Sequence, residues 1–210
     1  MQLPQLLRSY ELLADRADQA FAAMSQEHGE SVRCRRGCSD CCHAVFGLFL
    51  IEAAYVLTHF QGMALEVQKA SLLRCGDMER GLRRLEKKMQ VHQEDPQMQN
   101  FIMASERIRC PLLDQEQNCV LYTHRPITCR IYGIPTRVHG KARVCGKSGF
   151  QAGESYPVFD LDGMYRSLYG LSLELLRSAG REDPERASLL ISLSKALVTP
   201  VEMLIREGPE

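Results

Sequence analysis

The chain has 210 residues, with 26 basic and 26 acidic side chains and therefore a formal net charge of zero. This length is enough for one domain with its own hydrophobic core. The balanced charge gives no argument for a nucleic-acid or membrane partner, which a strong excess of positive charge would provide.

Helical periodicity dominates the N-terminal half of the chain. Apolar residues recur three and four positions apart over residues 3–27 and again over residues 64–92, which predicts two long amphipathic helices. Residues 47–60 predict a buried helix, and the longest apolar stretch, residues 44–57, is too short and too polar to span a bilayer. An Asp-Pro pair then predicts the capped start of a shorter helix over residues 95–108.

The pattern changes at residue 110. Residues 110–122 predict a small hairpin, and an Arg-Pro pair after it predicts one or two helical turns that hold Cys129. Loops and short extended pieces follow, punctuated by glycine and proline. Helical periodicity returns over residues 161–176, a second Asp-Pro pair predicts one helix over residues 183–198, and residues 199–202 predict the start of a last short one.

These elements predict a mainly α fold, in which helices flank a small irregular α+β cysteine-rich metal-binding centre. Residues 1–157 are expected to form the cysteine-cluster metal-binding domain with its N-terminal helices. Residues 158–210 are expected to add C-terminal helices that pack on the same domain. Strands and helices do not alternate, and the sequence contains no internal repeat.

Eight of the nine cysteines lie in two segments of the chain. They are Cys34, Cys38, Cys41 and Cys42 in the first segment, and Cys110, Cys119, Cys129 and Cys145 in the second. Thiolates spaced three to four residues apart can converge on one centre, as they do in zinc knuckles and iron–sulfur loops. The start of the sequence has no signal peptide pattern, so we expect a cytoplasmic protein whose clustered cysteines bind metal rather than form disulfides.

The eight cysteines divide naturally into two sites of four thiolates. Consecutive side chains point in different directions, so we expect Cys41 and Cys42 to face different centres or one of them to be a spare thiol. The two segments could interleave or could each hold one site, and the sequence leaves both arrangements open. Cys75 lies on the apolar stripe of its helix and is expected to be a core residue.

The surroundings of the cysteines are basic. No acidic residue occurs from Gln117 to Gly153, whereas this window contains six lysines and arginines. Nearby cations lower thiol pKa and stabilise the negative charge of a four-thiolate site. Arg125 and Arg130 flank Cys129 and are expected to donate to sulfur or to backbone carbonyls, or, for Arg125, to pair with an acidic side chain. The competing interpretation of this window is an anion- or RNA-binding patch.

Three motifs in combination resemble one known family. They are Cys38-Ser39-Asp40-Cys41-Cys42 with Cys34 before it, Cys110-Pro111-Leu112-Leu113 followed by Cys119-Val120-Leu121-Tyr122, and Arg125-Pro126-Ile127-Thr128-Cys129-Arg130. This combination is similar to the YkgJ-type cysteine-cluster family, which is described as a zinc- or iron-chelating domain. The resemblance covers residues 34–145 and implies metal chelation. The first gap here is three residues, where the family pattern implies two.

The resemblance extends to flagellin lysine N-methylases, which share a similar cysteine cluster. This sequence shows no glycine-rich strand–turn–helix signature for S-adenosylmethionine, so methyl transfer does not carry over with the metal. The first three cysteines also have the spacing of a radical-SAM cluster loop. However, Asp40 stands where that family has an aromatic residue, and the βα repeats of a barrel are missing.

We therefore expect a metal-binding protein with one or two all-thiolate sites, structural or engaged in metal handling, with metal ions as its partners. The cofactor is zinc or an iron–sulfur cluster, since all-thiolate ligation suits both. One alternative is an iron–sulfur enzyme of redox or protein N-methyl-transfer type. A weaker alternative is a zinc-stabilised binding module for a protein or RNA. His43 and His124 are alternative ligands, and no set of catalytic residues stands out.

Overall fold

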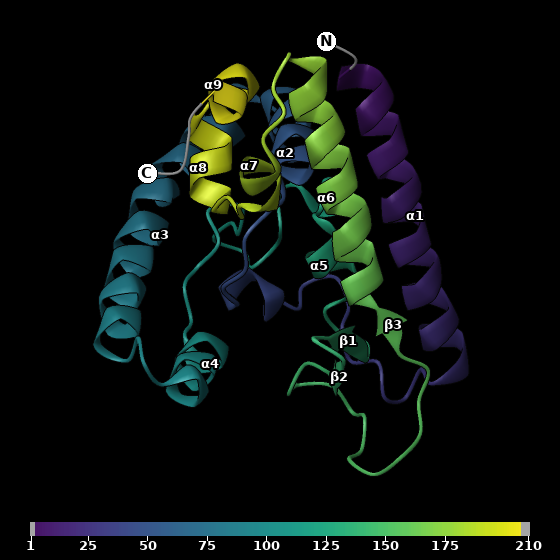
Figure 1. The fold of residues 1–210 in the computed structure, drawn as a ribbon. Coiled ribbons are helices and arrows are strands. Elements are labelled where there is room, and N and C mark those ends of the chain that lie inside the picture. The colour runs from purple at the N-terminus through teal and green to yellow at the C-terminus, as the bar shows by residue number, and fades with distance from the viewer. Residues whose placement is uncertain (1–2, 207–210) are drawn as a thin grey trace.

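A computed structural model describes residues 3–206 of the chain and has a mainly helical fold (Figure 1). Its helices are α1 (Leu3–Glu27), α2 (Leu50–Gln61), α3 (Leu65–Val91), α4 (Pro96–Ser105), α5 (Ile127–Ile131), α6 (Leu161–Ser178), α7 (Pro184–Ser188), α8 (Leu193–Val198) and α9 (Val201–Arg206). Its strands are β1 (Thr136–Val138), β2 (Lys141–Arg143) and β3 (Phe159–Asp160), and its single turns of 3-10 helix are η1 (Cys41–His43) and η2 (Tyr122–His124). The prediction of helices around a small irregular centre is confirmed.

Helix α2 forms the middle of the hydrophobic core. Its residues from Leu50 to Leu57 are all buried, so the helix is covered on every side. Helices α1, α6, α8 and α9 pack around it, and Figure 1 shows α1 and α6 side by side along one flank of the molecule. Among the described residues, no helix is both long enough and apolar enough to cross a bilayer.

The two long outer helices are amphipathic in the way their periodicity predicts. Helix α1 buries one face through Tyr10, Ala14 and Ala17, while polar residues fill the opposite face. Helix α6 buries Leu168 and Leu175 in the same core. Side chains three and four positions apart lie on the same helix face, which explains how both helices cover α2 without exposing an apolar stripe.

Helix α4 begins as predicted, because the Asp95 side chain accepts hydrogen bonds from the backbone N–H groups of Gln97 and Met98 at 3.1 and 2.9 Å. It ends at Ser105, short of the predicted residue 108. Helix α3 runs unbroken through two glycines. A Cβ at one of these, Gly81, would come within 2.9 Å of Ile108, so the absence of a side chain there permits close packing.

Two predictions about local structure are wrong. The single helix expected over residues 183–198 is divided into α7 and α8, because the chain between them is extended and Ile191 pairs with Leu48 through two backbone hydrogen bonds of 2.8 Å. Ser192 then caps α8 by accepting from the backbone N–H of Lys195. The hairpin expected over residues 110–122 is reduced to one antiparallel bridge between Leu113 and Cys119.

The small sheet has the strand order β2-β1-β3. Strands β1 and β2 are antiparallel, with Thr136 opposite Arg143 and Arg137 opposite Ala142, whereas β1 and β3 are parallel. Successive side chains of a strand point to opposite faces, so Thr136 and Arg143 share one face of the sheet and Arg137 lies on the other. Figure 1 places this sheet at the same end of the molecule as α4.

Candidate metal centre

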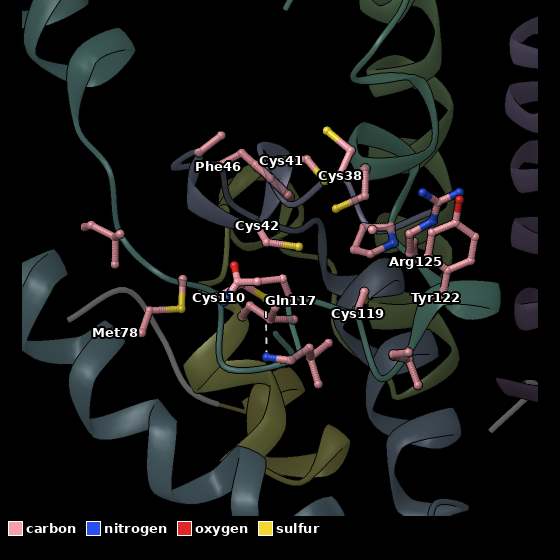
Figure 2. Close-up of a pocket in the computed structure, with 18 residues that line it drawn as sticks. Cys38, Cys41, Cys42, Phe46, Met78, Cys110, Gln117, Cys119, Tyr122 and Arg125 are labelled. Atoms are coloured by element: carbon pink, nitrogen blue, oxygen red, sulfur yellow. Dashed lines mark hydrogen bonds between the residues drawn. The ribbon is translucent and has the colours of Figure 1, made fainter. Parts of the chain in front are cut away.

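Cysteines from both segments line two small neighbouring cavities. The inner cavity, of about 40 Å³, is lined by Cys38, Cys41, Cys42, Cys110, Cys119 and Cys129. The outer cavity, of about 20 Å³, is lined by Cys34, Cys38, Cys41 and Cys145. Figure 2 shows the labelled cysteines of both segments around the inner cavity. Each cavity has room for one to a few water-sized spheres, which suits an ion and excludes an organic ligand.

Backbone hydrogen bonds join the two cysteine segments. The single turn η1 carries Cys41 and Cys42, and the N–H of Cys110 donates to the carbonyl of Cys42 at 2.7 Å. The N–H of Ile108 donates to the carbonyl of His43 at 3.0 Å. These bonds place Cys110 beside the double cysteine although the two lie far apart in sequence.

Two sulfur atoms also accept backbone hydrogen bonds. The N–H of Leu112 lies 3.4 Å from the sulfur of Cys110, and the N–H of Lys147 lies 3.4 Å from the sulfur of Cys145. In each case the donor is two residues further along the chain. A hydrogen bond of this kind stabilises a thiolate, but at Cys145 burial and the hydrogen bond to Asp40 outweigh it and raise the pKa of the thiol.

The thiols of the inner cavity share protons with one another. Hydrogen bonds from Cys129 and then from Cys42 lower the pKa of Cys41 to about 3. The hydrogen bonds that Cys42 makes with Cys110 and Cys119 raise the pKa of Cys42. The bond to Cys41 likewise raises the pKa of Cys129. Full deprotonation of these thiols would bring several negative charges together, which a bound cation would offset.

Arg125 supplies positive charge at the wall of the inner cavity. Its guanidinium carbon lies 3.9 Å from the centroid of the Tyr122 ring, and Figure 2 shows the two side chains together. The charge of Arg125 acts to lower the pKa of both Cys41 and Cys119. Its Nε is buried and has no hydrogen-bond partner among the residues that the structure describes. A buried donor left free beside a group of thiols fits a site that is completed by an anionic metal–thiolate group.

Arg130, the second arginine that flanks Cys129, holds the loop in place. Its side chain donates to the backbone carbonyls of Arg125 and Thr123, each at 2.8 Å, and forms an ion pair with Asp18 of α1. The expectation of a donor to backbone carbonyls is therefore confirmed for Arg130. No acidic partner of Arg125 is found in residues 3–206.

A buried carboxylate organises the outer cavity. Asp40 is only 7% exposed, and it accepts from Arg107 at 2.6 Å, from Lys147 at 3.0 Å and from the thiol of Cys145 at 3.3 Å. Burial acts to raise the pKa of Asp40, but the hydrogen bonds from Lys147 and Cys145 and the charge of Arg107 outweigh burial, so the pKa is lowered. Asp40 therefore fixes the Cys145 loop against the first cysteine segment.

Cys34 approaches the outer cavity past Gly133. Any side chain at Gly133 would overlap the Cβ of Cys34, so only glycine allows this approach. Burial raises the pKa of Cys34 to about 11, and the nearby thiols of Cys38 and Cys41 add to this effect.

The remaining predicted residues lie elsewhere. Cys75 is buried in the hydrophobic core with its sulfur 3.5 Å from the carbonyl of Ser71, and it lines neither cavity. His43 bonds through Nδ1 to the carbonyl of Ser39. His124 bonds to the Tyr55 hydroxyl at 3.0 Å and stacks on His59. Neither histidine lines the two cavities.

In the described part of the chain, no group of three or more Cys, His, Asp or Glu side chains is arranged so that it could hold a metal ion. The donor set nevertheless fits a thiophilic metal. Thiols face one another across the cavities, backbone N–H groups point at sulfur, and a buried arginine donor stays free.

Comparison with known protein families gives one match. The sequence model of the CxxCxxCC family, whose description reads "Putative zinc- or iron-chelating domain", matches residues 33–146, more than half of the chain. The chain belongs to the CxxCxxCC family. The matched CxxCxxCC region contains all eight clustered cysteines and excludes α6 to α9. A search of curated proteins and a search of solved structures found no match.

Two residues at this CxxCxxCC centre escaped the sequence analysis. Asp40 lies inside the Cys-Ser-Asp-Cys-Cys motif and pairs with Lys147 of the second segment. The sequence did contain a signal for this pairing, because residues 117–153 are basic and include no acidic residue of their own. Gly133 gave no such signal, because its role depends on the approach of Cys34 from a distant segment.

Proposed function

We propose that this CxxCxxCC protein binds zinc or iron in two adjacent all-thiolate sites that hold the two cysteine segments together. In this proposal the inner site uses Cys42, Cys110, Cys119 and Cys129, and the outer site uses Cys34, Cys38, Cys41 and Cys145. The observation that carries the proposal is that cysteines of both segments line the same two cavities.

The contacts of the double cysteine support this division. Cys42 is hydrogen-bonded to Cys110 and Cys119 of the second segment, which supports its place in the inner site. Cys41 lines both cavities: its charge acts on Cys34, which supports the outer site, while its hydrogen bond to Cys129 joins it to the inner set. In the proposal the two consecutive cysteines therefore serve different centres.

The size of the cavities favours a structural or metal-handling role over catalysis at the metal. Neither cavity has room for an organic substrate beside the thiols. The segments that carry the cysteines contain little regular structure, so ligation would supply much of the free energy that orders them. All nine cysteines are free thiols, which suits the reducing cytosol that we include in the proposal.

The chain's own residues prepare the sites for metal. The thiols lose their protons on binding, and the N–H groups of Leu112 and Lys147 stabilise the resulting charge on Cys110 and Cys145. Arg125 offsets negative charge at the inner site, and Asp40 holds the Cys145 loop beside the first cysteine segment. A bound metal supplies the positive charge that holds the thiolates together.

The test is elemental analysis and the visible spectrum of protein purified without oxygen. Zinc without a visible band supports structural or metal-handling sites, whereas iron with matching sulfide and a broad visible band identifies the iron–sulfur alternative in the same ligands. Cys42→Ser and Cys145→Ser are each expected to lower the metal content, and Cys75→Ala is the matched control that retains it. Protein that contains neither metal, or a Cys42→Ser variant with unchanged metal content, contradicts the proposal.

A further inference from the structure

A third and much larger cavity adjoins the cysteine centre. This cavity, which we call the β2 cleft, has a volume of about 570 Å³ and lies between the end of α4 and the β1–β2 hairpin. Figure 1 shows α4 and the hairpin on opposite sides of the same end of the molecule. Asp40, Tyr132, Cys145 and Lys147 line both the β2 cleft and the outer cysteine cavity, so the two cavities share a wall.

Apolar and aromatic side chains form one part of the wall of the β2 cleft, and charged side chains form another. Phe46 and Ile131 lie among the residues at its walls, and Tyr132 and Tyr165 contribute two phenol rings. Met103 and Ala104 of α4 close one side. Small-molecule sites are clefts of about 300–1,000 Å³ that combine apolar walls with polar groups, and the β2 cleft has this size and both kinds of wall.

The charges of the β2 cleft leave one cation without a carboxylate partner. The two carboxylates at its walls are already paired, since Asp40 binds Arg107 and Lys147, and Glu106 binds Lys88 at 2.6 Å. Arg143 also lines the cleft, and within residues 3–206 it forms no ion pair with an acidic side chain. An entering anion would therefore find an available guanidinium at the rim of an apolar chamber.

We propose that the β2 cleft binds a small organic anion with an apolar or aromatic body. The body of the ligand packs among Phe46, Tyr132 and Tyr165, and its anionic group pairs with Arg143. The ligand lies beside the loop of Cys145 because the cleft and the outer cavity share that wall. This site is additional to the metal sites, and its binding energy comes from residues that are not metal ligands.

Two dyes that share a naphthalene–phenyl body test this proposal on the full-length protein as purified. Anilinonaphthalene sulfonate carries a negative charge and phenyl-naphthylamine does not. Both are expected to bind with increased fluorescence. Added salt should weaken the charged dye more than the neutral one.

The sheet offers a matched pair of variants. Arg143→Ala should weaken binding of the anionic dye about tenfold, a typical value for one charge-assisted contact, and should leave the neutral dye unchanged. Arg137→Ala removes the same charge from the neighbouring strand on the opposite face, so it should leave both dyes unchanged. Both arginines are exposed, so neither variant is expected to disturb folding.

A third variant tests the location of the body of the ligand. Ala104→Trp places a large side chain at an exposed position on the cleft wall and should reduce binding of both dyes. Equal losses from Arg143→Ala and Arg137→Ala would overturn the proposal, and so would unchanged dye binding in Ala104→Trp. Because these variants leave every cysteine in place, their dye binding can fail while metal content is normal, which separates this proposal from the metal sites.

Discussion

The helical frame formed by α1, α2 and α6 and the cysteine centre formed by residues 34–43 and 110–145 reach order by different physical routes. The frame buries long apolar faces, and residues such as Leu50 and Leu168 have no exposed surface. The cysteine centre contains only short elements, and its sulfur atoms enclose small cavities beside the apolar residues that segment 110–145 adds to the same core. Water exclusion therefore stabilises the frame, whereas the loops that carry the cysteines also depend on hydrogen bonds and, in our proposal, on ligation.

Removal of the metal should have the largest effect and should separate the two regions most clearly. We expect EDTA with a reductant to release the bound metal and to raise amide hydrogen exchange strongly in residues 34–43 and 110–145. Structural zinc contributes on the order of 10 kcal/mol to the folding of small sites, so the centre should lose most of its order. Amides of α2 should stay protected; equal loss of protection in both regions would contradict the division into frame and centre.

A cavity in the frame should produce the converse result. Leu168→Ala removes a fully buried side chain from α6 and should lower the free energy of unfolding by about 2–5 kcal/mol. Denaturant unfolding measures this loss. At denaturant concentrations below the midpoint of unfolding, the variant should contain as much metal as the parent protein. A variant that unfolds cooperatively but contains no metal would show that the frame itself positions the ligands.

The two regions should also respond to pH in opposite directions, because Glu52 is buried in the frame. Its carboxylate accepts hydrogen bonds from the N–H groups of Phe49 and Ile127 and from Tyr10, but desolvation outweighs them and raises the pKa of Glu52 to about 7. The folded state thus holds this proton more tightly than the unfolded chain does. The contribution of Glu52 to the stability of the fold is fully present below pH 4.5, the pKa of this group in the unfolded chain. This contribution is lost as the pH rises to about 7, its pKa in the folded protein.

We expect this loss to be on the order of 3 kcal/mol. The measurement is the free energy of unfolding against pH for the parent protein and for Glu52→Gln, which cannot titrate. The difference in free energy of unfolding between the two proteins should change between pH 4.5 and 7 and should be constant above pH 7. The metal centre should weaken in the other direction, because protons compete for thiolates at low pH. Parallel curves for the two proteins would contradict the raised pKa.

A change at the contact between the two segments of the cysteine centre should have the smallest effect on stability. Gly133→Ala would overlap the Cβ of Cys34, so it should displace this residue and lower metal content at the outer site, with a cost of about 1–3 kcal/mol. Gly146→Ala is the control, since a Cβ there meets no atom within 4 Å. Elemental analysis of both variants distinguishes them, and equal metal content would exclude Cys34 as a ligand.

The periodicity of the sequence was sufficient to predict the frame. Helices α1, α3 and α6 begin and end within a few residues of their predicted limits, because their apolar stripes face a single core. The break after α7 could not be predicted in this way. It depends on the pairing of Ile191 with Leu48, a contact between segments far apart in sequence that overrides local helix propensity.

The cysteine centre was predictable in composition and family but not in geometry. The motifs identified the CxxCxxCC family and the eight clustered cysteines from residue types and spacing alone. Which cysteines share a cavity depends on how Cys110 and Cys145 approach the first segment, and those approaches are made by backbone and carboxylate hydrogen bonds. The β2 cleft could not be predicted from the sequence either, because its walls come from four separate parts of the chain that only the fold brings together.

The contact between Asp40 and Cys145 also affects how the protein is made. The two residues lie 105 positions apart, so the first cysteine segment leaves the ribosome well before its partners. At typical translation rates of about 5–20 residues per second, Cys145 is synthesised roughly 5–20 s after Asp40. During that interval four closely spaced thiols stand open to oxidants and to competing metals. Assembly of the proposed metal sites should therefore be most efficient where these thiols stay reduced until Cys145 has been synthesised.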